Sequence, residues 1–201
     1  MKRSALSICV FALIMAATPA LAQDSSFKIF GALNYVMPMS DENVAGLGTL
    51  EASDELGYEL GFEWRATEKL GLEVSYLTAN HDVELDGTKL GEIDLEPLSA
   101  ALNIHFYSSD MVDVYAGPVV SYVLWSDVEL VEPFVTALGT NELKTDSEFG
   151  YGATLGADFK ISDALVIQTG LRWLFVDAPV DGVADVGVDP LFIRAGLGYR
   201  F

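Results

Sequence analysis

The sequence contains a single cysteine, Cys9, which lies inside an N-terminal segment typical of a secretory signal. This segment, residues 1–22, has a basic start at Lys2 and Arg3, a short apolar core and the small-residue ending Ala20-Leu-Ala22, so we expect it to be cleaved. The remaining chain, 23–201, would then hold no cysteine. Its absence excludes a disulfide framework and a thiolate metal site.

Long hydrophobic runs are also missing. The chain is 51% hydrophobic with a mean hydropathy of +0.32, yet no stretch after residue 22 approaches the roughly eighteen apolar residues that a membrane helix needs. Basic residues are few as well, with 11 Lys and Arg against 30 Asp and Glu, for a net charge of -19. Removing Lys2 and Arg3 makes the charge -21. No nucleic-acid partner is expected, because phosphate binding requires basic residues.

The apolar residues instead alternate with small or polar residues, a period of two that predicts β-strands. Eight such segments can be read, and short connectors (67–69, 108–111, 162–164) alternate with longer ones (39–53, 83–92, 126–145, 178–185). The expected strands are 27–38, 54–66, 70–82, 93–107, 112–125, 146–161, 165–177 and 186–201. This pattern predicts an all-β fold, an eight-stranded antiparallel transmembrane up-and-down β-barrel. We expect one domain, the outer-membrane barrel of residues 23–201, after the signal peptide of residues 1–22.

The two faces of each expected strand differ in chemistry. Leu56, Tyr58 and Leu60 fall on one face of the second strand, whereas Gly57 and Glu59 fall on the other. Aromatic residues collect at both ends of the apolar faces, as at the two interfaces of a membrane. The chain closes on Tyr199-Arg-Phe201, the C-terminal signature of such a barrel. A soluble sandwich or lipocalin-like barrel also alternates, but the charges and glycines on the polar face favour the membrane barrel.

The inward charges predict a plug of ion pairs in the periplasmic half of the barrel. An eight-stranded barrel is only wide enough for side chains to fill, and an unpaired buried charge would be costly. The candidate plug residues are Lys28, Glu63, Arg65, Glu73, His105, Asp113, Asp158, Lys160, Arg172, Arg194 and Arg200.

The outer half of the lumen is expected to be apolar, with Glu59 as its main charge. The candidate lining residues are Val36, Leu77, Val123, Trp125, Leu174, Val176 and Phe192. Apolar walls above a charged floor do not suit ion conduction. They suit a pocket that admits a small hydrophobic molecule from outside and releases it sideways through the wall.

A resemblance to a known family rests on several short stretches and on Gly31 with Pro38, and four of the stretches are the most extended. They are Val186-Gly-Val-Asp-Pro190 with the closing strand to Phe201, Leu70-Gly-Leu-Glu-Val74, Tyr115 to Tyr122, and Phe149-Gly-Tyr-Gly152. Here the chain resembles the outer-membrane protein W (OmpW/AlkL-like) family over essentially its whole mature length. The resemblance implies an eight-stranded barrel with a narrow hydrophobic channel for small apolar compounds. One departure is Pro97-Leu-Ser99, where the family has Pro-Pro-Thr.

The sequence supports a catalytic function less well than a transport function. His81 with Asp82 could act as a general base beside a serine in a lipid-modifying enzyme, but no serine has a distinguishing motif, and His81 better fits a rim or loop-packing role. Glu59, Glu63 and Glu73 could imitate a glycosidase carboxylate pair, although lumen ion pairs explain them more simply. We therefore expect no enzyme activity, no cofactor and no metal site.

Two functions remain beside the enzyme reading. The first hypothesis is passive uptake of small hydrophobic solutes across the outer membrane. The alternative is a non-transporting barrel that anchors the envelope or presents acidic loops to a surface. Expected partners are outer-membrane lipid and lipopolysaccharide, the barrel-assembly machinery acting on the C-terminal strand, and small hydrophobic solutes.

Overall fold

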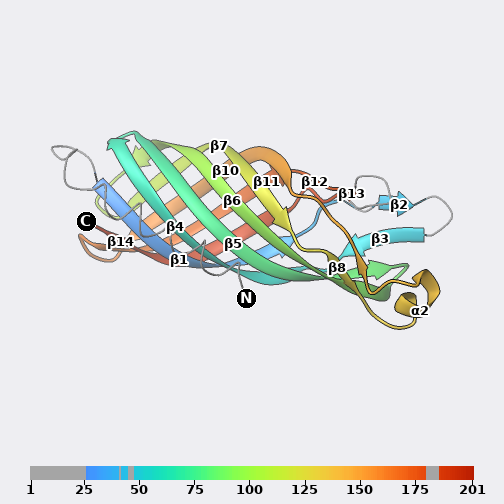
Figure 1. Ribbon diagram of the computed structural model, residues 1–201. Helices are drawn as coiled ribbons and strands as arrows, with labels where there is room; N and C mark the ends of the chain where they lie inside the picture. Colours follow the sequence, from blue (N-terminus) through green and yellow to red (C-terminus); the bar gives the residue numbers. More distant parts are fainter. Residues whose placement is uncertain (1–25, 41, 45–47, 180–185) are drawn as a thin grey trace.

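A computed structural model describes residues 26–40, 42–44, 48–179 and 186–201, so the expected signal segment lies outside it. Within this part of the chain, eight long strands form a closed antiparallel barrel (Figure 1). They are β1 (Ser26–Met37), β4 (Glu55–Thr67), β5 (Leu70–Leu85), β6 (Thr88–Ser108), β7 (Val112–Trp125), β10 (Glu148–Lys160), β11 (Leu165–Phe175) and β14 (Leu191–Arg200). Each pairs with the next, and β1 also pairs with β14. The predicted fold is confirmed, and closure removes the open edge that lipid would not tolerate.

One end of the barrel carries the tight connectors and the other carries a folded extension (Figure 1). We call these the turn end and the loop end. The extension contains β2 (Glu42–Val44), β3 (Gly48–Ala52), β8 (Val128–Leu130), α2 (Phe134–Leu138), β9 (Glu142–Leu143), β12 (Asp177–Ala178) and β13 (Val186–Gly187). No helix in the described ranges is long and apolar enough to cross a membrane.

The extension corrects the strand boundaries expected from sequence. The sequence predicts a loop at residues 83–92, but β5 and β6 continue through most of them to a turn at Asp86 and Gly87. Both turn residues have positive φ, 49° and 73°, as a two-residue hairpin turn requires. The predicted last strand, 186–201, is instead divided into β13 and β14, with Asp189 at a φ of 40° between them.

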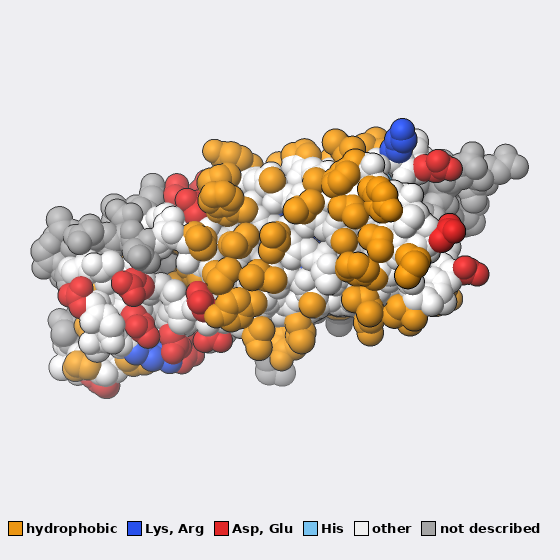
Figure 2. Space-filling model, turned by 180° about the vertical axis from the view of Figure 1, so that it is seen from behind, with side chains coloured by type: hydrophobic (Ala, Val, Ile, Leu, Met, Phe, Trp, Pro, Cys, Tyr) orange, Lys and Arg blue, Asp and Glu red, His pale blue; other side chains and the backbone are white. Residues whose placement is uncertain are grey.

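The outer wall is apolar over the middle of the barrel, as the alternation predicts. Leu56, Tyr58 and Leu60 of β4 are exposed while Gly57 and Glu59 between them are buried. Figure 2 shows hydrophobic side chains gathered over the middle of the wall and acidic ones toward the ends. Aromatic pairs mark both margins: Phe27 packs on Phe62 at the turn end, whereas Tyr122–Phe149 and Tyr151–Phe175 pack toward the loop end. These margins delimit the membrane-spanning part of the wall.

Small residues on the inner face make room for large ones on neighbouring strands. The ring of Tyr115, which is fully buried, lies directly over Gly156 of the paired strand, and a methyl group added at Gly156 would overlap the ring. Gly61 accommodates Phe30 in the same way. The inward glycines are therefore part of the lumen packing.

This packing predicts that Gly156→Ala destabilises the barrel by about 1–3 kcal/mol, the usual cost of overpacking a filled interior. Gly31→Ala is the matched control, because a methyl group there meets Leu60 at an ordinary 3.5 Å on the outer wall. Urea unfolding in lipid vesicles measures both. Equal midpoints for the two variants would contradict the assigned packing.

Candidate functional site

The turn-end half of the lumen is filled by ion-paired side chains, which we call the charged floor. Its members are Lys28, Glu59, Glu63, Arg65, Glu73, His105, Asp113, Asp158, Arg172, Arg194 and Arg200. Lys28 Nζ lies 2.8 Å from both Glu63 Oε2 and Asp158 Oδ2. Arg200 reaches the same Asp158 oxygen at 2.8 Å. Three strands distant in sequence, β1, β4 and β10, thus meet through one ammonium group.

Two arginines form the upper layer of this floor. Arg172 of β11 contacts Glu59 at 3.1 Å and Glu73 at 2.9 Å, and Arg194 of β14 contacts the same carboxylates at 3.6 and 2.8 Å. The amide of Asn34 donates to Glu59 at 2.9 Å. Glu59, expected as the main charge of the outer half, therefore belongs to the floor. Strand alternation predicts that Glu59 faces the lumen, but it does not predict which cations pair with it.

His105 occupies the lower layer. Its Nε2 lies 3.0 Å from Glu63 and its Nδ1 lies 3.1 Å from Asp113, which also pairs with Arg65. Lys160 is the exception among the predicted plug residues. It forms none of the ion pairs found in the described ranges, and its ammonium donates to the backbone carbonyl of Ser109 at the turn end (2.6 Å).

The floor is closely balanced in charge. Its five carboxylates, Glu59, Glu63, Glu73, Asp113 and Asp158, face five lysine and arginine side chains and His105. All five carboxylates are almost completely buried. Mutual pairing offsets the cost of removing these charges from water, so the lumen can be filled with charges without an ionic solute.

Above the floor the lumen is filled by buried apolar side chains, which we call the apolar chamber. All seven candidate lining residues are buried there in one cluster. The cluster also contains residues that fall in the expected loops or outside the candidate lining set: Val83, Leu90, Ile93, Leu95, Val128, Leu130, Ala178 and Val188. Period-two alternation does continue through Val83 and Ile93, and this signal could have extended the strands. The chamber therefore rises beyond the outer aromatic margin into the extension.

A cavity of about 60 Å³ remains within the chamber, roughly the space of two water molecules. Its walls come from β3, β5, β6, β7, β8, β12 and β13. His81 lines it from β5 and Trp125 from β7, and both side chains are buried. The sequence predicts His81 as a rim or loop-packing residue. In the structure its side chain turns inward and contacts the connector before β4, with Nδ1 2.7 Å from the carbonyl oxygen of Ser53.

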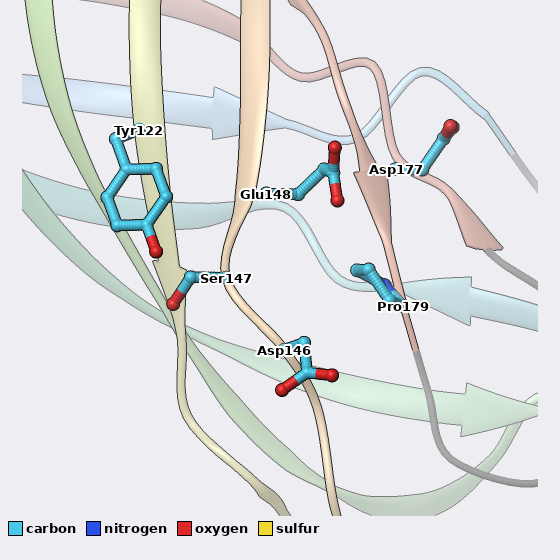
Figure 3. A pocket seen from close by; sticks show the side chains of 6 residues that line it. All are labelled: Tyr122, Asp146, Ser147, Glu148, Asp177 and Pro179. Carbon is cyan, nitrogen blue, oxygen red and sulfur yellow. The ribbon is translucent and has the colours of Figure 1, made fainter.

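A larger depression, of about 640 Å³, lies near the outer aromatic margin (Figure 3). Tyr122, Ser147 and Pro179 line it together with three carboxylates, Asp146, Glu148 and Asp177. Tyr122 faces outward on β7, so this depression is separate from the chamber. Its acidic lining adds to the negative charge near the loop end.

The candidate catalytic pair is not assembled. His81 and Asp82 are neighbours on one strand and so point to opposite faces of the wall. His81 faces the cavity, while Asp82 accepts from Lys89 at 2.8 Å on the outer side. The glutamates considered for glycoside cleavage are each occupied by cations of the floor.

Comparison with known proteins shows which family this barrel resembles. The OmpW family model matches residues 26–201. The chain belongs to the OmpW family. It is 23% identical over 221 residues to Outer membrane protein W of Vibrio cholerae, covering all of both chains.

Solved structures agree with this family at the level of the fold. OprG of Pseudomonas aeruginosa aligns with a TM-score of 0.77 and 23% identity, covering 89% of this chain and 97% of that one. The outer membrane protein AlkL, solved in lipid bilayers, aligns with a TM-score of 0.63 and 16% identity over 92% and 93% of the two chains. An OmpW-family barrel is an outer-membrane protein, and this family and fold are generally non-enzymatic.

Proposed function

We propose that this barrel is a passive route by which small, uncharged, apolar solutes enter from outside the cell. The observation that carries the proposal is the continuous buried apolar chamber above the charged floor. A solute that leaves water for such a chamber gains the free energy of burying apolar surface. Ions gain nothing there, because the apolar walls offer no polar groups to replace their hydration. In this arrangement residues 1–22 direct export, and the loop end faces outward.

The solute's exit is proposed to be sideways, because the charged floor fills the lower lumen. A weak point in the wall supports this. The β5–β6 ladder pairs Tyr76 with Leu98 and resumes at Ala79 with Leu95 in the same register. Between these pairs lies Pro97, which has no N–H to donate. Leu77, opposite Pro97 in that register, belongs to the apolar chamber, so the interruption adjoins the chamber at the outer aromatic margin.

Proteoliposomes test the proposal directly. Vesicles containing the wild-type barrel should take up a poorly water-soluble hydrocarbon from a donor suspension several times faster than protein-free vesicles, whereas their ion conductance should stay at the protein-free level. Uptake at the protein-free rate would contradict the transport proposal.

The alternative function, presentation of acidic loops, can be separated from transport by a variant that changes only the charge of the loops. Replacing Glu129, Glu132 and Glu142 with glutamine removes charge from exposed positions of the extension without touching the chamber cluster. Hydrocarbon uptake should be unchanged in this triple variant. Removing residues 127–143 would be a poorer test, since Val128 and Leu130 are chamber walls.

A further inference from the structure

Two buried side chains that line the chamber cavity each carry a polar atom with no hydrogen-bond partner among the described residues. These atoms are Nε2 of His81 and Nε1 of Trp125. Both side chains line the same cavity, and the two residues are only 2% and 8% exposed. Buried polar groups are nearly always hydrogen-bonded, and leaving one unpaired is costly. Two such atoms on side chains that line one cavity point to a polar group that binds beside them.

The surroundings of these two atoms are otherwise apolar. His81 pairs with Ile93 across the β5–β6 ladder, and Trp125 pairs with Leu95 across the β6–β7 ladder. Ile93 and Leu95 both line the cavity. β6 thus separates the imidazole from the indole. Two strand spacings of about 10 Å, together with a two-residue offset along β6 of about 7 Å, put the two backbones about 12 Å apart. Each side chain reaches inward from its own side of an aliphatic surface.

The hydrogen-bonding roles of the two atoms follow from their chemistry. A carbonyl oxygen can only accept, so Nδ1 of His81 must carry the hydrogen that it shares with Ser53. His81 lies beyond the aromatic margin of the wall, and burial lowers the pKa of its imidazole below the ordinary value. In the resulting neutral ring Nε2 is a bare acceptor. The indole Nε1–H of Trp125 is only a donor.

We infer that the chamber selects apolar molecules that carry one uncharged hydroxyl group, such as a medium-chain alcohol. The hydroxyl hydrogen is donated to Nε2 of His81, and its oxygen accepts from Nε1 of Trp125. The hydrocarbon tail packs among the chamber side chains, which must move apart because the cavity itself holds only about 60 Å³. This inference rests on the proposed uptake function and adds a solute class to it. A carboxylate is a poor fit, because it cannot donate to Nε2 and must approach an acidic loop end. A plain alkane leaves both atoms unpaired.

Nuclear magnetic resonance on the full-length barrel in lipid nanodiscs tests this inference. The chain has two histidines and three tryptophans, so imidazole and indole nitrogen signals can be assigned by substitution. Titration with n-octanol should shift the His81 Nε2 and Trp125 Nε1 signals, whereas n-octane should move neither in the direction of hydrogen bonding. His105 in the charged floor is the internal control for the imidazole, and outward-facing Trp173 controls for solute dissolved in the lipid.

Two variants remove the hydrogen bonds one at a time. His81→Leu removes the acceptor, and Trp125→Phe removes the donor while keeping an aromatic ring. Each should lower the ratio of n-octanol to n-octane affinity about tenfold, the value of one buried hydrogen bond. Trp173→Phe should leave that ratio unchanged. Strand content measured by circular dichroism checks folding, and if His81→Leu does not fold, Trp125→Phe alone still decides.

The outcomes separate this inference from the proposed function. Equal affinities for n-octanol and n-octane that neither variant changes would overturn the hydroxyl selection and leave hydrocarbon uptake standing. Octanoate binding more tightly than n-octanol would also overturn it. Chamber signals that respond to none of the three solutes would remove both proposals together.

Discussion

Replacing Glu73 with leucine is expected to destabilise the barrel by about 3–5 kcal/mol, the cost of breaking a buried ion pair from one side. Oε1 of Glu73 lies 2.9 Å from Arg172 and 2.8 Å from Arg194, and Glu73 is 1% exposed. Without this carboxylate, two buried guanidinium groups share only Glu59. Urea unfolding in lipid vesicles, followed by tryptophan fluorescence, gives the loss of free energy.

Two further variants make the Glu73 result specific. Glu68→Leu changes the same residue type in an exposed turn of the wall, so it should cost less than about 0.5 kcal/mol. Adding Arg194→Leu to Glu73→Leu removes one of the two guanidinium groups left without this carboxylate. The double variant should therefore recover part of the lost free energy of unfolding. If Glu73→Leu unfolds at the same urea concentration as Glu68→Leu, the charged floor does not stabilise the barrel.

The barrel itself could be predicted from sequence because its physical signal is local. Every spanning strand alternates between lipid and lumen, so Leu56 and Tyr58 against Gly57 and Glu59 identify both the strand and its faces without knowledge of any partner. The same alternation placed ten of the eleven candidate plug residues among the ion-paired side chains. It also put the seven candidate lining residues on the inner face, where they are buried.

What the sequence could not predict depends on register and depth. Whether Glu59 lies in the apolar half or in the floor is decided by Arg172 and Arg194, more than a hundred residues away in sequence. Lys160 alternates correctly, yet it lies low enough for its ammonium to reach a turn carbonyl. Alternation fixes direction every second residue, but it carries no information on height relative to the other strands.

The extension escaped prediction for a related reason. Beyond the aromatic margin the outer face of β5 and β6 is charged, with Asp82, Lys89 and Glu92 joined by ion pairs at 2.7 to 2.8 Å. Charged residues at period two resemble an acidic loop when the lipid pattern is the criterion. The inner face continues through Val83 on one strand and Ile93 on the other, so Val83 belongs to the chamber although it falls in the connector expected at 83–92. A search for inward alternation alone would have included it.

A lysine in place of Leu174 is expected to reduce hydrocarbon uptake to the rate of protein-free vesicles. Leu174 of β11 is completely buried in the apolar chamber. On the same face, Arg172 lies on its turn-end side and Val176, just after β11, on its loop-end side. An ammonium group there has no unpaired carboxylate beside it and is repelled by Arg172. It therefore retains water, and a hydrocarbon that passes must displace that water.

Leu174→Met is the control for this experiment, since it conserves apolar character and approximate volume and should transport at nearly the wild-type rate. Strand content and the urea midpoint must show that both variants are folded. Uptake by folded Leu174→Lys at the wild-type rate would mean that solute does not pass this part of the lumen. Such a result would contradict the proposed route through the chamber.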